Sequence, residues 1–258
     1  MSQLADYFKT RIFMAMPVNG DVAKKRLAHW TAQALNVLEK TPSGNNLLKQ
    51  LPDSLYFSMR KTLGGYYGRA FGDGMYIGLA CDKLYSLKEV LPVLMHECVH
   101  VAHNIEIKKK CPKRSIYEDF LFEYLSEFGA RLQEKNVIQE STKNQLLLYD
   151  SSFFKKNPQF YGPLASVSEI CQDVDHSYLN DFLRVGLATS CKEEDEATIR
   201  QIKTYFKKQY PDLSPQIYAH IRSVFFNKAN EVLCSSKCSW LTRYEKRLLR
   251  QYISRERD

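Results

Sequence analysis

Hydrophobic residues recur at helical spacing over most of this chain. In the segment from Asp21 to Lys40, one stripe holds Leu27, Trp30 and Ala34 and continues to Val37 or Leu38. A stripe of this period predicts an amphipathic helix that packs against a core. Helical patterns also cover much of the C-terminal half, over residues 165–188, 192–208, 214–231 and 238–254.

Short strand-like segments interrupt this helical pattern before residue 86. They are Leu55–Met59, Gly65–Ala70 and Met75–Ala80. The last two are joined by a loop that contains Asp73-Gly74, a dipeptide typical of tight hairpins. The sequence therefore predicts an α+β fold that is mostly helical. A small antiparallel or mixed sheet precedes the next helix, and a helical lobe forms the C-terminal part.

The helix after these strands carries the most informative stretch of the chain, His96-Glu97-Cys98-Val99-His100. Apolar residues surround it at 90–95 and again at Val101, which suits a buried helix with one polar face. Ser86 and Glu89 make a capping-box pair. Proline is tolerated only in the first helical turn, so Pro92 predicts either a start near residue 91 or a kink there.

The spacing of the two histidines gives this stretch its chemistry. Residues four apart lie on one face of a helix, so the imidazoles of His96 and His100 can reach one metal ion. Glu97 lies beside them, where a metal-bound water would sit. Zinc lowers the pKa of such a water to about 7, and a carboxylate can take its proton during attack on a peptide carbonyl. The alternative is a helix that carries two histidines by accident.

A zinc hydrolase also needs a third protein ligand and an open fourth position. His103 follows the motif, and we expect it on the cleft rim or at an exposed helix end. The better source is the next helix, predicted over 115–135, where Glu123 and Glu127 are four apart and share a face. We expect the other glutamates of this helix to form a solvated acidic stripe. They are Glu118 and Glu134.

With both helices considered, the chain resembles the gluzincin branch of the zincin metallopeptidases, in which a second helix supplies a glutamate ligand. The resemblance covers residues 40–135 and rests on His96–His100 and on the Glu127-x-x-Ala130 element. It implies a zincin-like fold in which His96, His100 and Glu127 bind Zn²⁺ and Glu97 is the general base. Glu123 would be a neighbour of the ligands, or the third ligand itself if the register differs by one turn.

The upstream segment 41–51 is similar to the helix-opening segment of small bacterial effector- and toxin-type zincins. In these enzymes, a strand just before the motif helix lines the cleft and pairs with extended substrate. The resemblance assigns that role to residues 75–79, which would bind substrate by strand addition.

The resemblance also implies a downstream histidine or tyrosine that stabilises the oxyanion of the tetrahedral intermediate. His176 is the first candidate for this catalytic role, because Asp173 or Asp175 beside it could orient its ring. The alternatives are Tyr149, Tyr161 and His220.

Length and composition fit one metallopeptidase domain over residues 1–258. We expect an N-terminal lobe over about 1–140 and a helical lobe over 165–258, with a loop at 150–164 between them. Hydrophobic content of 44% and charged content of 26% are typical of globular proteins. No apolar run approaches the roughly 20 residues that span a bilayer.

The N-terminus is a poor signal peptide, because its apolar run at 12–18 is short and contains proline. We therefore expect a cytoplasmic protein, or one delivered into a host cell without a cleaved signal. The seven cysteines are odd in number and irregularly spaced, which predicts free thiols. Cys98 is expected to be a small buried residue rather than a ligand.

The net charge of +8 is clustered. A basic loop at 108–114 lies between the two helices of the predicted site, and residues 240–253 form a basic amphipathic helix. Such charge can steer an acidic partner surface. The helix is expected to be a solvated surface, whereas the loop favours acidic substrate segments. No recognised nucleic-acid-binding module is present.

These observations predict a zinc-dependent endopeptidase that cuts a specific intracellular protein and acts as a monomer, in the manner of a delivered bacterial effector or toxin. The substrate itself is not identified by any motif. One alternative is a regulatory or DNA-associated housekeeping zinc peptidase. Another is a non-catalytic binding protein with a zincin fold, against which the presence of Glu97 argues, since a structural metal needs no base.

Overall fold

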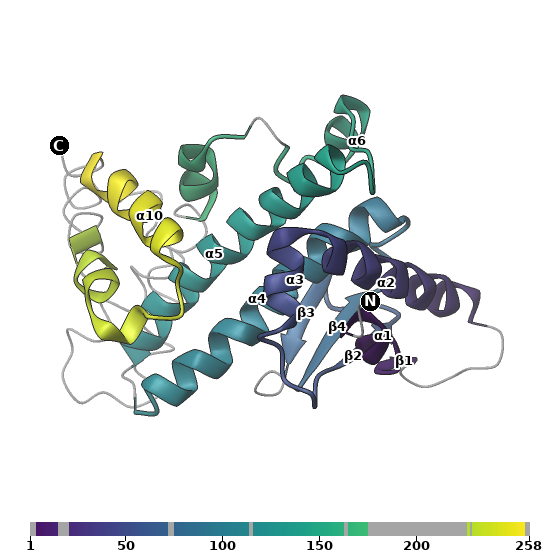
Figure 1. Cartoon of the computed structure of the whole chain (residues 1–258), viewed down its shortest axis with the longest axis horizontal. Coiled ribbons are helices and arrows are strands. Elements are labelled where there is room, and N and C mark those ends of the chain that lie inside the picture. The colour runs from purple at the N-terminus through teal and green to yellow at the C-terminus, as the bar shows by residue number, and fades with distance from the viewer. Residues whose placement is uncertain are drawn as a thin grey trace, which may run out of the picture. The chain divides into compact units, whose positions relative to one another are not determined.

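A computed structural model describes residues 4–14, 21–71, 75–113, 116–162, 165–174, 226–227 and 229–255. Helices dominate, and one four-stranded sheet of mixed direction precedes the histidine-bearing helix (Figure 1). The predicted α+β, mostly helical fold class is therefore confirmed. In chain order the elements are α1 (Leu4–Lys9), β1 (Ile12–Met14), α2 (Val22–Lys40), α3 (Pro42–Leu48), β2 (Tyr56–Arg60), β3 (Gly68–Phe71), β4 (Tyr76–Ala80), α4 (Leu87–Lys110), α5 (Ile116–Lys143), α6 (Ser151–Lys156), the 3₁₀ turn η3 (Ser236–Cys238) and α10 (Arg243–Arg255).

The sheet has the strand order β1-β2-β4-β3. β1 and β4 both pair with β2 in parallel, and β3 pairs with β4 as an antiparallel strand. β4 is therefore flanked on both sides, and β3 is an edge strand. The prediction that residues 75–79 bind substrate by strand addition is wrong, because β2 and β3 already occupy both edges of β4.

One face of the sheet is buried against helices. Phe57 and Met59 of β2 and Ile77 and Leu79 of β4 are all 0% exposed, as the alternation of side chains along a strand requires. α2 packs against β1 and β2, and its N-terminus is capped by Asp21, which accepts a hydrogen bond from the backbone N–H of Lys24 at 3.1 Å. The core thus lies between the sheet and the apolar sides of α2 and α4.

α4 runs without interruption through Pro92, which is its sixth residue. A proline has no N–H to donate to the carbonyl four residues before it, and for Pro92 that carbonyl belongs to Lys88. The hydroxyl of Tyr149, which is 7% exposed, donates to this same carbonyl at 3.0 Å. A side chain from 61 residues away therefore supplies the hydrogen bond that the proline cannot make.

The next helix, α5, is longer than predicted and continues to Lys143. A further short helix, α6, lies within the segment that was predicted to be a loop, and Asp150 caps it by accepting from the N–H of Phe153 at 2.9 Å. Both differences lengthen the helical framework around the histidine-bearing helix.

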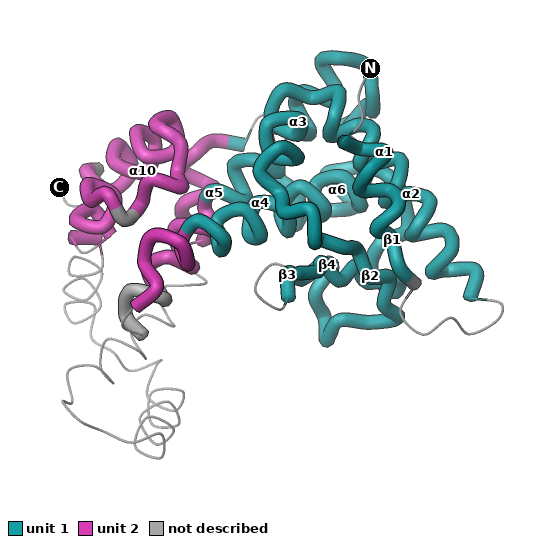
Figure 2. The backbone as a smooth tube through the Cα atoms, turned by 60° about the horizontal axis from the view of Figure 1, so that its bottom comes forward, with its two compact units in different colours: residues 1–106, 129–165 teal, residues 107–128, 166–258 magenta. Residues whose placement is uncertain are grey.

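The chain divides into two compact units, 1–106 with 129–165, and 107–128 with 166–258 (Figure 2). This division differs from the predicted lobes, since 107–128 falls with the C-terminal residues. α5 crosses the division as one continuous helix. The first unit contains the sheet and both histidines of the motif.

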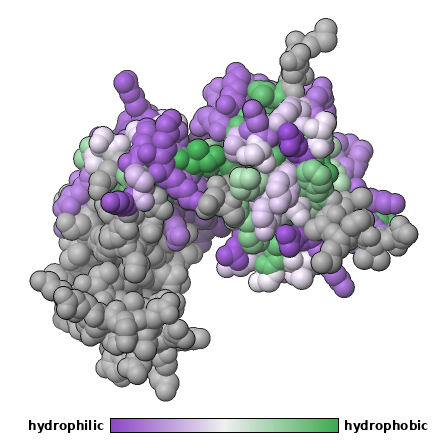
Figure 3. Space-filling model, turned by 90° about the horizontal axis from the view of Figure 1, so that it is seen from below, coloured by the Kyte–Doolittle hydropathy of each residue, from purple (hydrophilic) through white to green (hydrophobic). Residues whose placement is uncertain are grey.

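The surface and the cysteines of the described part of the chain agree with the sequence-based predictions. No helix in the described ranges is both long and apolar enough to cross a membrane. On the face that Figure 3 presents, apolar residues form separate patches among hydrophilic ones. The six cysteines within the described part of the chain form no disulfides, as predicted.

Candidate metal centre

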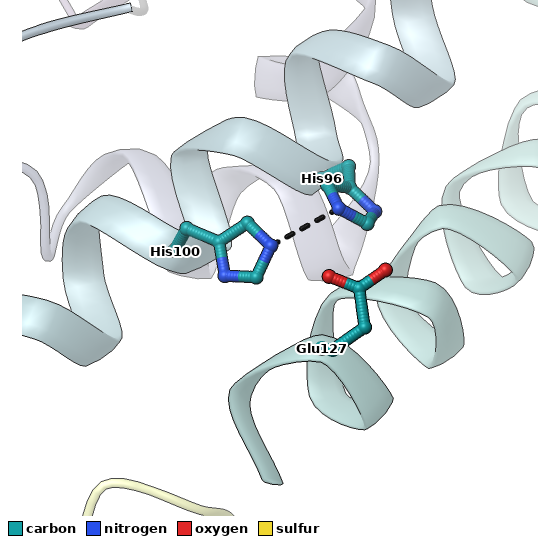
Figure 4. Close-up of side chains that lie close together, drawn as sticks. All are labelled: His96, His100 and Glu127. Atoms are coloured by element: carbon teal, nitrogen blue, oxygen red, sulfur yellow. Dashed lines mark hydrogen bonds between the residues drawn. The ribbon is translucent and has the colours of Figure 1, made fainter. Parts of the chain in front are cut away.

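Helix α4 brings the rings of His96 and His100 together, one turn apart on the same side (Figure 4). Their Nε2 atoms lie 3.0 Å apart, and their ring planes cross at 74°. Two imidazole nitrogens that bind one zinc ion at about 2.0–2.1 Å with tetrahedral angles are about 3.3 Å apart. The observed separation is within a few tenths of an ångström of this spacing, so the pair fits a single metal ion.

Glu127 of α5 completes a group of three metal-ligating side chains. Its carboxylate points toward the two rings in Figure 4, and the ligand atoms of His96, His100 and Glu127 all lie within 4.8 Å of one another. Glu123, the alternative third ligand, is exposed and is not part of this group. The described side chains therefore bring together the ligand set that the resemblance implies.

Glu134, which follows Glu127 by two helical turns on α5, contacts the ring of His96. It is only 1% exposed, and its Oε2 atom lies 3.3 Å from Nδ1 of His96 and 3.5 Å from Nη1 of Arg131. The prediction of a solvated glutamate is wrong here, because the buried carboxylate pairs with His96 and Arg131. The side chain of Glu118 lies outside the described residues.

The contact between Glu134 and His96 also bears on the proton of the imidazole. A carboxylate beside Nδ1 favours the tautomer that carries its proton there and leaves a lone pair on Nε2. Nε2 is the atom of His96 that faces His100. The ring is thus oriented and prepared to donate a lone pair to a cation at this position.

Glu97 turns away from the core and toward the edge of the sheet. It is 8% exposed, and its Oε2 accepts a hydrogen bond from the backbone N–H of Ala70 in β3 at 2.9 Å. Gly68 provides the space for this arrangement, since a Cβ atom there would lie 2.8 Å from Cγ of Glu97. The strand next to the candidate base is therefore β3, not β4.

His103 does not lie on a cleft rim as predicted. It is 8% exposed, and burial, with a smaller contribution from His100, lowers its pKa to about 3. The imidazole is therefore neutral at ordinary pH. Cys98 is 0% exposed, which agrees with its predicted role as a small buried residue, and burial raises the pKa of its thiol well above the ordinary value.

The candidates for the oxyanion-stabilising residue are only partly within the described ranges. His176 and His220 lie outside them, as does Asp175. The hydroxyl of Tyr149 is already engaged with the carbonyl of Lys88, which gives this tyrosine a structural role. The ring of Tyr161 lies 5.9 Å from the guanidinium carbon of Arg131, the residue that pairs with Glu134.

The lysines of the predicted basic loop are exposed where the structure describes them. Lys108, Lys109 and Lys110 form the last turn of α4, and Lys113 follows.

Sequence patterns missed three contributors to the site: Glu134, Gly68 and the N–H of Ala70. Of these three, only Glu134 could have been found from the sequence. It follows Glu127 by seven residues, about two helical turns, which places both on one face of the helix.

No protein-family model, curated protein or solved structure matches this chain.

Proposed function

We propose that this chain is a zinc-dependent peptidase of the gluzincin type, with His96, His100 and Glu127 as ligands of Zn²⁺ and Glu97 as the general base. The observation that carries the proposal is the grouping of two imidazoles and one carboxylate within 4.8 Å, with a glutamate directly after the first histidine. Three protein ligands of this composition leave one position open, as in catalytic zinc sites.

A bound zinc ion would lower the pKa of a water molecule to about 7 and polarise the carbonyl of a substrate. The chain's own groups have separate tasks. Glu97 accepts the proton of the attacking water, and its hydrogen bond to Ala70 holds the carboxylate against β3. Glu134 orients the ring of His96 through Nδ1.

The outer edge of β3, which pairs with no other strand in the described part of the chain, supports an extended peptide as the substrate. The backbone carbonyl of Tyr67 accepts a hydrogen bond from the N–H of Ala80 at 3.0 Å. Because the pattern alternates along an antiparallel pair, Arg69 also faces β4, whereas Gly68 and Ala70 turn their backbone groups outward. Of these groups, the N–H of Ala70 is already bound by Glu97. An extended segment can pair with such an edge by strand addition.

The substrate in this proposal is a protein, cut in an extended segment. The net charge of +8 supports a partner with an acidic surface. As a delivered effector or toxin, or as a resident cytoplasmic enzyme, the chain would act on an intracellular protein.

The test is hydrolysis of an unfolded protein, such as reduced casein, by the zinc-loaded full chain. We expect cleavage that a chelator abolishes, and a loss of about 10²- to 10⁴-fold in rate for Glu97→Gln with zinc content unchanged. Glu123→Gln is the matched control, because it neutralises an exposed carboxylate outside the ligand group. Equal rates for Glu97→Gln and wild type would contradict the proposal.

A further inference from the structure

The face of the sheet opposite the helices carries a row of four aromatic rings, one from each strand. We call Phe13, Tyr56, Tyr76 and Phe71 the outer aromatic row. Tyr56 stacks on Tyr76 with centroids 5.2 Å apart, and Tyr76 stacks on Phe71 at 4.9 Å. Phe13 meets Tyr56 edge-on at 5.5 Å and is 51% exposed. The row thus crosses the whole sheet up to the outer edge at β3.

Two arginines lie over this row. The guanidinium carbon of Arg60 is 5.5 Å from the ring centre of Tyr76 and 5.8 Å from that of Phe71. The guanidinium carbon of Arg69 is 5.2 Å from the ring centre of Phe71 and 5.5 Å from that of Tyr66. Contact with ring faces holds a guanidinium in place and leaves the N–H groups at its edge free to bind an anion.

Neither arginine has a carboxylate partner in the described part of the chain. Nε of Arg60 is buried and makes no hydrogen bond there, while Arg69 is exposed. A guanidinium fixed in this way matches the two oxygens of a carboxylate, with which it can form paired hydrogen bonds. The outer face therefore offers positioned cationic groups that lack a countercharge within the described ranges.

The place of Arg69 connects this surface with the candidate site. Arg69 lies between Gly68 and Ala70, the two residues that turn their backbone groups to the outer edge of β3, where the N–H of Ala70 binds Glu97. A strand added at this edge would continue the pleat of the sheet, so its alternate side chains would lie on the outer face. Cross-strand neighbours have Cβ atoms about 4.5–5.5 Å apart, within reach of the Arg69 guanidinium.

We infer that Arg69, assisted by Arg60, selects an acidic side chain of the substrate, an aspartate or glutamate in the extended segment that pairs with β3. This inference rests on the proposed peptidase function. Because Ala70, the neighbour of Arg69, binds Glu97, the selected residue lies close to the cleaved bond.

A single-stranded nucleic acid is a poorer fit to the same surface. Bases bind such platforms by stacking on exposed ring faces. In the outer aromatic row, the faces of Tyr56, Tyr76 and Phe71 are turned toward one another. Apart from Phe13 and Tyr66, which are exposed, the surface offers outward the arginine N–H groups, which suit a carboxylate.

The experiment measures binding and cleavage separately. For binding, full-length Glu97→Gln protein with zinc is titrated into fluorescein-labelled ten-residue peptides that differ only in a central Asp-Glu, Asn-Gln or Lys-Lys pair, and into oligo-dT. We expect the acidic peptide to bind about tenfold more tightly than its amide analogue. Adding Arg69→Gln should remove most of this preference, and adding Arg69→Glu should favour the lysine peptide instead.

Lys25→Gln is the matched control, because it removes one positive charge from an exposed position on α2, away from β3. It should leave the preference unchanged. Equal binding of acidic and amide peptides would overturn the inference, as would oligo-dT binding that depends on Arg69 in the absence of acidic-peptide binding. Thermal unfolding of each variant shows whether the fold is retained.

For cleavage, zinc-loaded wild type is incubated with a mixture of peptides of random sequence, and the products are sequenced by mass spectrometry. An acidic residue enriched at one position near the cut, and lost in Arg69→Gln, supports the inference. Cleavage without such enrichment overturns the inference and leaves the peptidase proposal intact. Acidic-peptide binding without any cleavage supports the acidic-peptide site and overturns the peptidase proposal.

Discussion

Replacing Tyr149 by phenylalanine tests whether its hydroxyl compensates for Pro92. The substitution keeps the ring, which packs against Phe153 with centroids 5.0 Å apart, and removes only the hydroxyl that donates to Lys88. The carbonyl of Lys88 would then lack both its helical donor and its side-chain donor. A buried acceptor left without a partner costs about 1–3 kcal/mol, and the half-buried setting of Lys88 places the expected loss at about 1–2 kcal/mol.

The decisive measurement is a double-mutant cycle with Pro92→Ala. Alanine restores an N–H that can donate to the carbonyl of Lys88, so Tyr149→Phe should cost less than about 0.5 kcal/mol in that background. Free energies of unfolding from urea titrations of the four metal-free proteins give the coupling. Equal costs of Tyr149→Phe in both backgrounds would refute the compensation.

Three further predictions concern the candidate site. Glu134→Gln should weaken zinc binding about 10- to 100-fold in a competition titration with a chelator, because it removes the charge beside Nδ1 of His96. An unchanged zinc affinity would show that Glu134 does not assist His96 as a ligand. Gly68→Ala should lower the free energy of unfolding by about 1–3 kcal/mol, since the added methyl group would overlap Glu97, and a neutral result would show that the strand can shift. In metal-free protein, the pKa of His103 is near 3 in the folded state and about 6.5 in the unfolded state. As the pH falls below about 6.5, the unfolded state binds the proton first, so the free energy of unfolding decreases. The loss between about pH 7 and pH 5 should be about 2 kcal/mol from this residue and absent in His103→Leu; identical pH profiles for the two proteins would contradict it.

Long periodic segments were predictable because their local pattern decides their structure. The helix expected from Asp21 to Lys40 is α2, which begins one residue later. The three predicted strands match β2, β3 and β4 to within three residues. In each case, apolar spacing and turn residues are properties of the segment itself.

Pairing and burial of polar groups depend on contacts between distant segments, which local patterns do not contain. β1 has only three residues, too few for an alternation, and its parallel pairing with β2 joins segments more than 40 residues apart. The same lack of long-range information led to the wrong edge strand, β4 in place of β3. Glu134 looks solvated in sequence, but contact with His96 keeps it buried.

The site itself was predictable to the extent that helix geometry fixes it. His96 and His100 share a face because they are four apart, and both candidate glutamates of α5 follow from the same rule. Choosing between Glu127 and Glu123 requires the rotation of α5 about its axis, which depends on how α5 packs. The structure groups Glu127, and not Glu123, with the two histidines.

Zinc binding by His96, His100 and Glu127 is tested by the zinc content of purified wild type, Glu127→Ala and Glu123→Ala, measured by plasma mass spectrometry after dialysis. We expect about one zinc ion per chain in wild type and Glu123→Ala, and little or none in folded Glu127→Ala. Folded wild type that takes up no zinc, even when the metal is added, would contradict this expectation.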